Sequence, residues 1–140
     1  RGIDVLLSKG ENGPFGDGAF GAVFIIVTLC FFDSPLKVLM EASRLLRRDG
    51  KIVLGVVLQE SPWGQYYQVK RTEDHRFYKH ATFYSYAEMK RLLNQTGFSM
   101  EHVLSTLFQK PGQVKYMESL QKGYSPNAGF AVILAGKSPD

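Results

Sequence analysis

The chain has 140 residues, of which 44% are hydrophobic and 21% charged. This composition excludes an intrinsically disordered chain and predicts one globular domain. The net charge is only +4 and the basic residues are scattered, so no dedicated nucleic-acid patch is expected. The longest apolar stretch, residues 19–32, is interrupted and falls short of the roughly 20 residues of a membrane helix, so no membrane contact is expected. The single cysteine excludes an internal disulfide and favours a reducing compartment, which predicts a cytoplasmic location.

The N-terminal part reads as a strand, a loop and a longer strand. Residues 3–7 are a short strand candidate, and residues 8–21 hold five glycines and a proline, which is typical of a loop. The apolar run at residues 22–29 is the first long strand. A parallel strand that is covered on both faces has such an uninterrupted apolar run instead of alternation.

A helix and a second long strand follow. Asp33 or Ser34 is the expected N-cap, a proline lies in the first turn, and apolar residues then recur at helical spacing. The pair Asp49-Gly50 is expected to end the helix with a left-handed residue. Residues 51–57 are the next buried strand, so the whole stretch predicts a right-handed strand–helix–strand unit. The basic residues near the turn are interpreted as a solvated helix end: Arg44, Arg47, Arg48 and Lys51.

The segment 58–83 is rich in aromatic and charged residues, and we expect a short helix after Ser61-Pro62. A clear helix comes next, because Ser85 and Glu88 form a capping box. Gly97 is expected to end that helix.

The C-terminal part contains two more strands. Residues 98–108 and 128–135 read as strands, and residues 109–127 between them as a loop. The loop has no strong helical pattern, so the two strands are predicted to pair antiparallel in one sheet with the earlier strands.

The run Gly16-Asp-Gly-Ala-Phe-Gly21 has the spacing of the dinucleotide-binding fingerprint. That fingerprint works where the glycines form a tight turn from a strand into a helix, so that a pyrophosphate rests on the helix N-terminus. Here a β-branched strand follows instead of a helix. An NAD-type binding domain therefore stays an alternative that rests on these glycines alone.

The same region resembles class I S-adenosylmethionine-dependent methyltransferases, in their small-molecule, type 11-like branch that includes quinone-biosynthesis enzymes. Residues 10–20, Gly-Glu-Asn-Gly-Pro-Phe-Gly-Asp-Gly-Ala-Phe, resemble the family loop Ala-Glu-x-Leu-Pro-Phe-x-Asp-x-Ser-Phe, which leads from the third to the fourth strand. The resemblance implies an α/β fold with a Rossmann-like, mostly parallel sheet that ends in an antiparallel pair. The family's last strand is inserted beside its fifth.

The resemblance also implies a cofactor site for S-adenosyl-L-methionine. In the family this loop borders the adenine, so Gly10 would present its backbone amide to the ring and Glu11 would follow. Val27, Thr28 and Leu29, at the tip of the next strand, would line the methionine side. The chain departs from the family pattern at Lys9, Gly13 and Gly21, where members carry an acid, a leucine and an aspartate.

The resemblance covers the C-terminal two-thirds of a methyltransferase domain. The first family strand, its glycine-rich turn and the acid that holds the ribose would all lie before Arg1. We therefore expect residues 1–140 to be one truncated domain that is inactive alone, and the strand at 22–29 to need a cover. That cover would be a preceding segment, a second copy in a homodimer, or residues 3–7 folded back.

The aromatic insert, residues 58–83, is expected to cover a small-molecule methyl acceptor. Aromatic residues there and in the last loop are the candidate acceptor contacts: Trp63, Tyr66, Tyr67 and Tyr124. His75 and His80 are weak candidates for a general base, with ordinary surface histidines as the competing interpretation. No spacing of His, Cys, Asp and Glu suggests a metal site.

Three functions remain open from the sequence. The first is methyl transfer from S-adenosylmethionine to an oxygen, nitrogen or carbon nucleophile. The second is a non-catalytic methyltransferase-like remnant that binds a partner through an exposed sheet edge. The third is the NAD-type domain.

Overall fold

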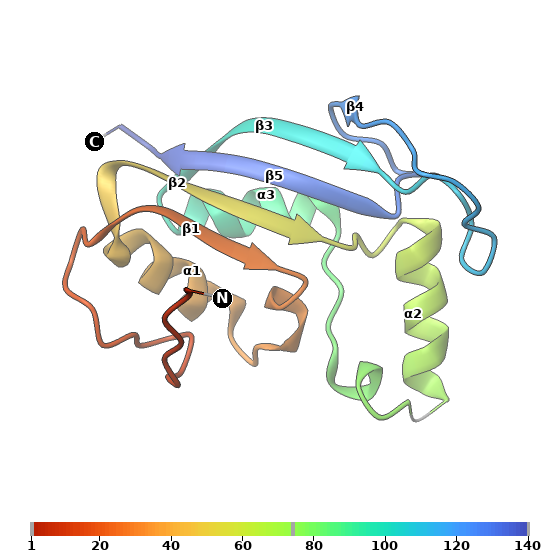
Figure 1. Ribbon diagram of the computed structural model, residues 1–140, viewed down its shortest axis with the longest axis horizontal. Helices are drawn as coiled ribbons and strands as arrows, with labels where there is room; N and C mark the ends of the chain where they lie inside the picture. The colour runs from red at the N-terminus through yellow and green to blue at the C-terminus, as the bar shows by residue number, and fades with distance from the viewer. Residues whose placement is uncertain (1, 74, 140) are drawn as a thin grey trace.

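The computed structural model describes residues 2–73 and 75–139, which form a five-stranded mixed sheet with three α-helices (Figure 1). The strand order is β1-β2-β5-β3-β4. The strands are β1 (Phe20–Ile26), β2 (Leu46–Val56), β3 (Phe98–Thr106), β4 (Gln121–Lys122) and β5 (Phe130–Lys137). The helices are α1 (Pro35–Leu45), α2 (Pro62–Thr72) and α3 (Tyr86–Gln95), with 3-10 turns η1 (Leu29–Phe31) and η2 (Tyr78–His80).

The sheet has the mixed direction that was predicted. β1 and β2 are parallel and joined through α1, whereas β5 is antiparallel to both of its neighbours, β2 and β3. The final strand thus lies between β2 and β3. This order confirms the prediction of one sheet with an antiparallel C-terminal pair.

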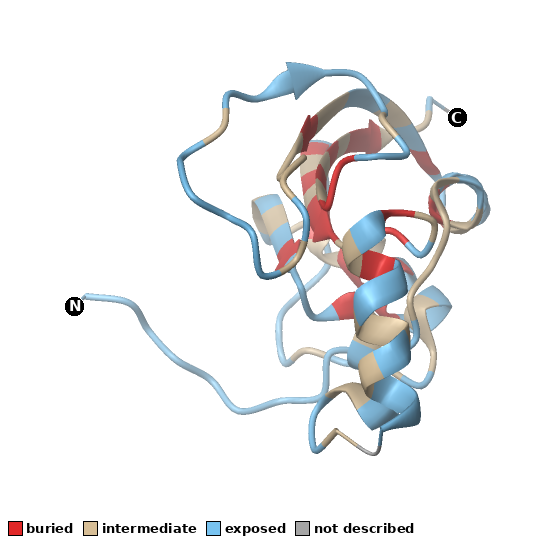
Figure 2. Cartoon of the chain, turned by 90° about the vertical axis from the view of Figure 1, so that its right-hand side faces the viewer, coloured by how far each residue is buried: buried red, intermediate tan, exposed pale blue. Residues whose placement is uncertain are grey.

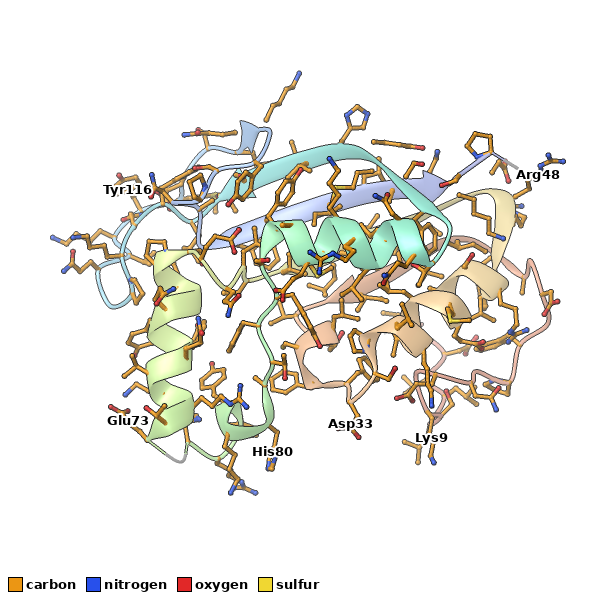
Figure 3. All side chains as sticks on the ribbon, turned by 180° about the vertical axis from the view of Figure 1, so that it is seen from behind. Lys9, Asp33, Arg48, Glu73, His80 and Tyr116 are labelled. Carbon is orange, nitrogen blue, oxygen red and sulfur yellow. The ribbon has the colours of Figure 1, made fainter. Side chains whose placement is uncertain are left out.

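The core lies between the sheet and the two helices α1 and α3, which both cover the same face (Figure 3). Alternate residues of β2 and β5 point into it, among them Ile52, Leu54 and Ile133, each fully buried. Met89 and Leu93 of α3 pack against them. Every second residue of these strands points toward the helices, and α3 carries a stripe of apolar residues along one side. The strands and the helix thus bury their apolar sides against each other.

The opposite face of the sheet carries none of the described helices, as Figure 1 shows from that side. β1 is also an edge strand in the described chain, since it pairs only with β2. Phe24 and Ile26 on β1 are therefore exposed, Phe24 to 67%. Burial of such apolar surface is worth about 25 cal/mol per Å², so this face and edge are suited to a partner.

The two predicted helices begin where their caps were expected. The side chain of Ser34 accepts a bond from the Lys37 amide, with Pro35 in the first turn of α1. Ser85 and Glu88 form the predicted capping box of α3. A short helix also follows Ser61-Pro62, as α2.

The predicted strand at residues 3–7 is wrong. These residues belong to no helix or strand, and Val5 is 92% exposed. An isolated strand has no partner for its backbone groups, and none of the described strands lies beside this one. The proposal that residues 3–7 fold back over β1 is therefore excluded in this structure.

The end of α1 also differs from the prediction. The helix ends at Leu45, and β2 begins at Leu46, five residues before the expected strand start. Gly50 does not have a positive φ. Its lack of a side chain is needed for space instead, because a Cβ there would lie 2.9 Å from the carbonyl oxygen of Arg47. Leu46 is buried in the core, and this burial favours the start of the strand at Leu46, before Gly50 is reached.

Smaller differences concern the element ends. The first long strand is shifted toward the N-terminus and stops at Ile26, and the predicted loop 109–127 contains the two-residue strand β4. Figure 2 shows α2 and this loop on one side of the molecule, both largely exposed. None of the described helices is long and apolar enough to cross a membrane.

Candidate cofactor and acceptor site

The carboxyl ends of β1 and β2 form the edge of the sheet at which open α/β folds bind ligands. β1 stops there because Val27 turns to a φ of 52°. A β-branched residue with positive φ is a genuine outlier, and such strain tends to gather at functional sites. The amide of Val27 donates to the carbonyl oxygen of Gly55 at 2.8 Å, which holds the two strand tips together.

A small hollow lies between these strand tips and the segment that leads into α3. Its cavity volume is about 30 Å³, which is room for one or two water-sized groups. No charged side chain lines it. Burial raises the pKa of the Cys30 thiol and of the Tyr84 hydroxyl, so both groups stay neutral near pH 7. The lining consists of Val27, Thr28, Leu29, Cys30, Gly55, Val56, Val57, Thr82, Phe83, Tyr84 and Met89.

A second hollow brings together two of the predicted cofactor contacts. Gly10 and Thr28, from different loops, both line it, along with Phe32. A Cβ on Gly10 would lie 2.7 Å from the ring of Phe32, so only glycine fits under that ring. Glu11 is partly buried on the same turn, where the Asn12 amide donates to the Lys9 carbonyl at 3.1 Å.

The loop that carries Gly10 is held in place by a partly buried ion pair on α1. The guanidinium of Arg44 donates to Glu41 at 2.7 and 2.9 Å, to the Asp17 carboxylate at 2.6 Å and to the Phe15 carbonyl at 2.9 Å. Glu41 is only 8% exposed and also accepts the Gly13 amide at 2.8 Å. Arg44 is thus not the solvated helix end that was predicted.

The hydrogen bonds between Glu41 and Arg44 also favour the charged form of each side chain. Hydrogen bonds from Arg44, together with the Gly13 amide, hold the pKa of Glu41 below its usual range. Hydrogen bonds to Glu41 and Asp17 raise the pKa of Arg44. Both groups remain charged at neutral pH, so the loop anchor is permanent under ordinary conditions.

The aromatic insert forms a ring cluster around Tyr67 on α2. Tyr67 lies 4.6 Å from the ring of Tyr78 and stacks on Phe83 at 6.0 Å. Burial and the neighbouring Tyr78 raise the pKa of Tyr67 to about 12. Tyr66 also touches the cluster, 5.5 Å from Tyr67, but is 42% exposed on its other side.

Trp63 connects α2 to the loop between β3 and β5. Its indole N–H donates to the carbonyl oxygen of Gln109 at 2.8 Å, and its ring lies directly over Gly129. Gln109 in turn holds its own loop, because its side chain bonds the Lys115 amide and the Tyr116 carbonyl. Figure 3 shows Tyr116 at the outer side of that loop.

Tyr124 belongs to a different group from the α2 cluster. Its ring stacks on Tyr86 with centroids 4.1 Å apart, and its hydroxyl donates to Glu60 at 2.7 Å. Burial and the bond to Glu60 raise the pKa of Tyr124 to about 12.

The two histidine candidates lie away from both hollows. His75 contacts the ring of Tyr78 at 4.7 Å and accepts the Phe77 amide. Figure 3 shows His80 at the lower end of the molecule, remote from the strands. Among the described residues, no three His, Cys, Asp or Glu side chains gather as metal ligands.

Gly16 to Gly21 lead directly into β1 and not into a helix. The glycines therefore lack the helix N-terminus on which a dinucleotide pyrophosphate rests. Gly18 has a φ of 63°, which a loop turn requires.

Four residues of the candidate site were not predicted from the sequence: Glu41, Glu60, Thr82 and Tyr84. Glu41 contacts Gly13 across 28 positions and Glu60 contacts Tyr124 across 64. The available signal was weak: an acid on the apolar side of a predicted helix, and another directly after a buried strand.

Comparison with known proteins matches the N-terminal part of the chain to a family. The family described as "Methyltransferase domain" matches residues 1–54. An uncharacterized protein of Methanocaldococcus jannaschii is 36% identical over 137 residues, which is 98% of this chain and 65% of that protein. An uncharacterized protein of Mycobacterium tuberculosis is 36% identical over 136 residues. The chain spans about half, 48%, of the mycobacterial relative's length.

Solved structures have the same fold. A Thermotoga maritima protein, described as an S-adenosylmethionine-dependent methyltransferase and "possible histamine N-methyltransferase", superposes with a TM-score of 0.91 at 34% identity. The match covers 98% of this chain and 65% of that one. A Streptomyces coelicolor geranyl diphosphate C-methyltransferase, solved with S-adenosyl-L-homocysteine, shares the fold with a TM-score of 0.62 at 13% identity over 94% of this chain and 53% of its own. The sheet order and these matches together show that the chain has the fold of the class I S-adenosylmethionine-dependent methyltransferases, and that residues 1–54 match a methyltransferase domain.

Proposed function

We propose that this chain provides the acceptor side of an enzyme that transfers a methyl group from S-adenosylmethionine to an oxygen, nitrogen or carbon atom of a small molecule. The observation that carries the proposal is the apolar hollow at the carboxyl ends of β1 and β2, together with a second hollow beside β1 and α1 that Gly10 and Thr28 line. The first hollow lies at the ligand-binding edge of the sheet and is free of charged side chains.

The residues fit the cofactor in two respects. Gly10 and Thr28 line one hollow, and the ring of Phe32 packs against Gly10 so closely that only glycine fits there. In the proposal the Gly10 amide and Glu11 contact the adenine, and Val27, Thr28 and Leu29 line the methionine side. The ion pair of Glu41 and Arg44 fixes the loop that presents Gly10.

The bound cofactor supplies an electrophilic methyl group that is transferred by in-line displacement. The protein's task is then to position the acceptor and to exclude water. The apolar hollow between the strand tips suits the exclusion of water. The aromatic residues Trp63, Tyr66, Tyr67 and Tyr124 are the proposed acceptor cover. His75 and His80 stay weak candidates for proton transfer, because neither lines a hollow.

Tight binding of the cofactor is proposed to need residues outside this chain. The open edge of β1 and the bare face of the sheet are where a preceding strand–turn–helix segment would pack, with a second copy as the alternative cover. A non-catalytic interaction domain would use the same open edge, and is the second candidate function for that reason.

The test is calorimetric binding of S-adenosylhomocysteine to two proteins. One is the 140-residue chain; the other is a hybrid that carries, in front of it, the part of the Thermotoga protein outside the matched region. We expect micromolar binding by the hybrid and none by the chain alone. A hybrid that folds but binds no S-adenosylhomocysteine favours the interaction domain, and one that binds NADH instead favours the dinucleotide alternative.

A further inference from the structure

Glu60 lies four residues beyond the carboxyl end of β2, and only one of its two carboxylate oxygens is hydrogen-bonded. Its Oε1 accepts the Tyr86 amide at 3.0 Å and the Tyr124 hydroxyl at 2.7 Å. Its Oε2 is buried and has no hydrogen-bond partner among the described residues. Buried polar atoms are nearly always paired, so this oxygen requires an explanation.

The surroundings of Glu60 restrict what the partner can be. A carboxylate only accepts hydrogen bonds, so the partner must be a donor, and a cationic donor best offsets the burial of a negative charge. Tyr86 and Tyr124 stack beside it with an interplanar angle of 8°. The faces of such rings attract cations.

Tyr124 is a partly exposed neighbour of this carboxylate. This side chain is 39% exposed, and it follows Gly123, whose φ of 90° only glycine adopts readily. Because Oε2 is buried, a ligand reaches it only if a neighbouring side chain such as Tyr124 moves. The site lies on the same edge of the sheet as the proposed acceptor hollow, because Glu60 follows β2 by four residues.

We infer that Glu60 binds a protonated amino group of the methyl acceptor, with the ammonium donating to Oε2 and the Tyr86–Tyr124 pair packing against the acceptor. This inference rests on the proposed function and narrows its substrate class to amines. It concerns recognition of the acceptor and does not specify which atom is methylated.

The test uses 2-phenylethylamine and its neutral counterpart 2-phenylethanol, titrated into the 140-residue chain while amide NMR signals are recorded. We expect the amine to shift the Tyr86 amide signal, since that amide donates to Glu60, and the alcohol not to shift it. Glu60→Gln keeps one oxygen for Tyr86 and Tyr124 but loses the charge. It should weaken amine binding about 10-fold or more, as for a charged hydrogen bond.

Glu73→Gln is the matched control, because it removes the same charge from an exposed glutamate at the end of α2 whose partner is Lys70. It should keep amine binding. Equal shifts from amine and alcohol in the wild-type chain would overturn the inference even if Glu60→Gln fails to fold. Unchanged amine binding by a folded Glu60→Gln variant would overturn it too, and would assign Oε2 to a bound water. Neither experiment needs the cofactor, so failure here is distinct from failure of the hybrid to bind S-adenosylhomocysteine.

Discussion

Replacement of Gly129 by alanine should separate α2 from the loop between β3 and β5. A Cβ at this position would lie 2.7 Å from both Cγ and Nε1 of Trp63, so the indole must move. That movement would also break the 2.8 Å bond from the indole to Gln109. Overpacking and a lost hydrogen bond together should lower the free energy of unfolding by about 2–4 kcal/mol.

Urea unfolding followed by circular dichroism measures this loss. Trp63 is the single tryptophan of the chain, so its fluorescence reports the local change directly. Gly16→Ala is the matched control, because a Cβ there meets no atom within 4 Å. Trp63→Leu should partly rescue the Gly129→Ala variant. A Gly129→Ala protein with the stability of the control and an unchanged emission maximum would refute the reasoning.

Three further predictions concern single side chains. The pKa of Tyr67 is about 12 in the folded protein and about 10 in the unfolded chain, so the free energy of unfolding should fall as the pH rises from 10 to 12. Tyr67→Phe should make that part of a plot of urea midpoint against pH less steep. An unchanged slope would contradict the assignment. Ser85→Ala should cost about 1 kcal/mol in the same assay, because α3 loses its capping box, with the exposed Ser8→Ala as a neutral control. Arg44→Met should raise the pKa of Glu41 in a carboxyl-carbon NMR titration, and a pKa that stays depressed would show that Arg44 is not its main cause.

The sequence predicted those parts of the fold whose causes are local. The starts of α1 and α3 follow from Ser34 and Ser85, each of which bonds an amide three residues on. The apolar runs of β1 and β2 marked the two parallel strands, although β1 is an exposed edge strand and only β2 is largely buried. The lack of a helix between β3 and β5 predicted their antiparallel pairing. Interactions within a few residues are sufficient for such features.

The parts that were missed depend on partners far along the chain. Residues 3–7 are apolar enough for a strand, but the described chain offers them no neighbour. Arg44 reads as a solvated helix end until Asp17, 27 residues away, is beside it. The end of α1 depends on the burial of Leu46, and no capping residue in the sequence marks that position as a helix end. Candidate site residues such as Gly10 were predicted through family resemblance and not from periodicity or composition.

The most direct test of the central claim is ultraviolet crosslinking of adenine-labelled S-adenosylmethionine to the hybrid protein, followed by peptide mapping. If this chain borders the cofactor as proposed, label should appear in the loop that contains Gly10 and Glu11, and an excess of S-adenosylhomocysteine should abolish it. Labelling confined to α2 or to the loop between β3 and β5, with none in residues 9–12, would contradict the account.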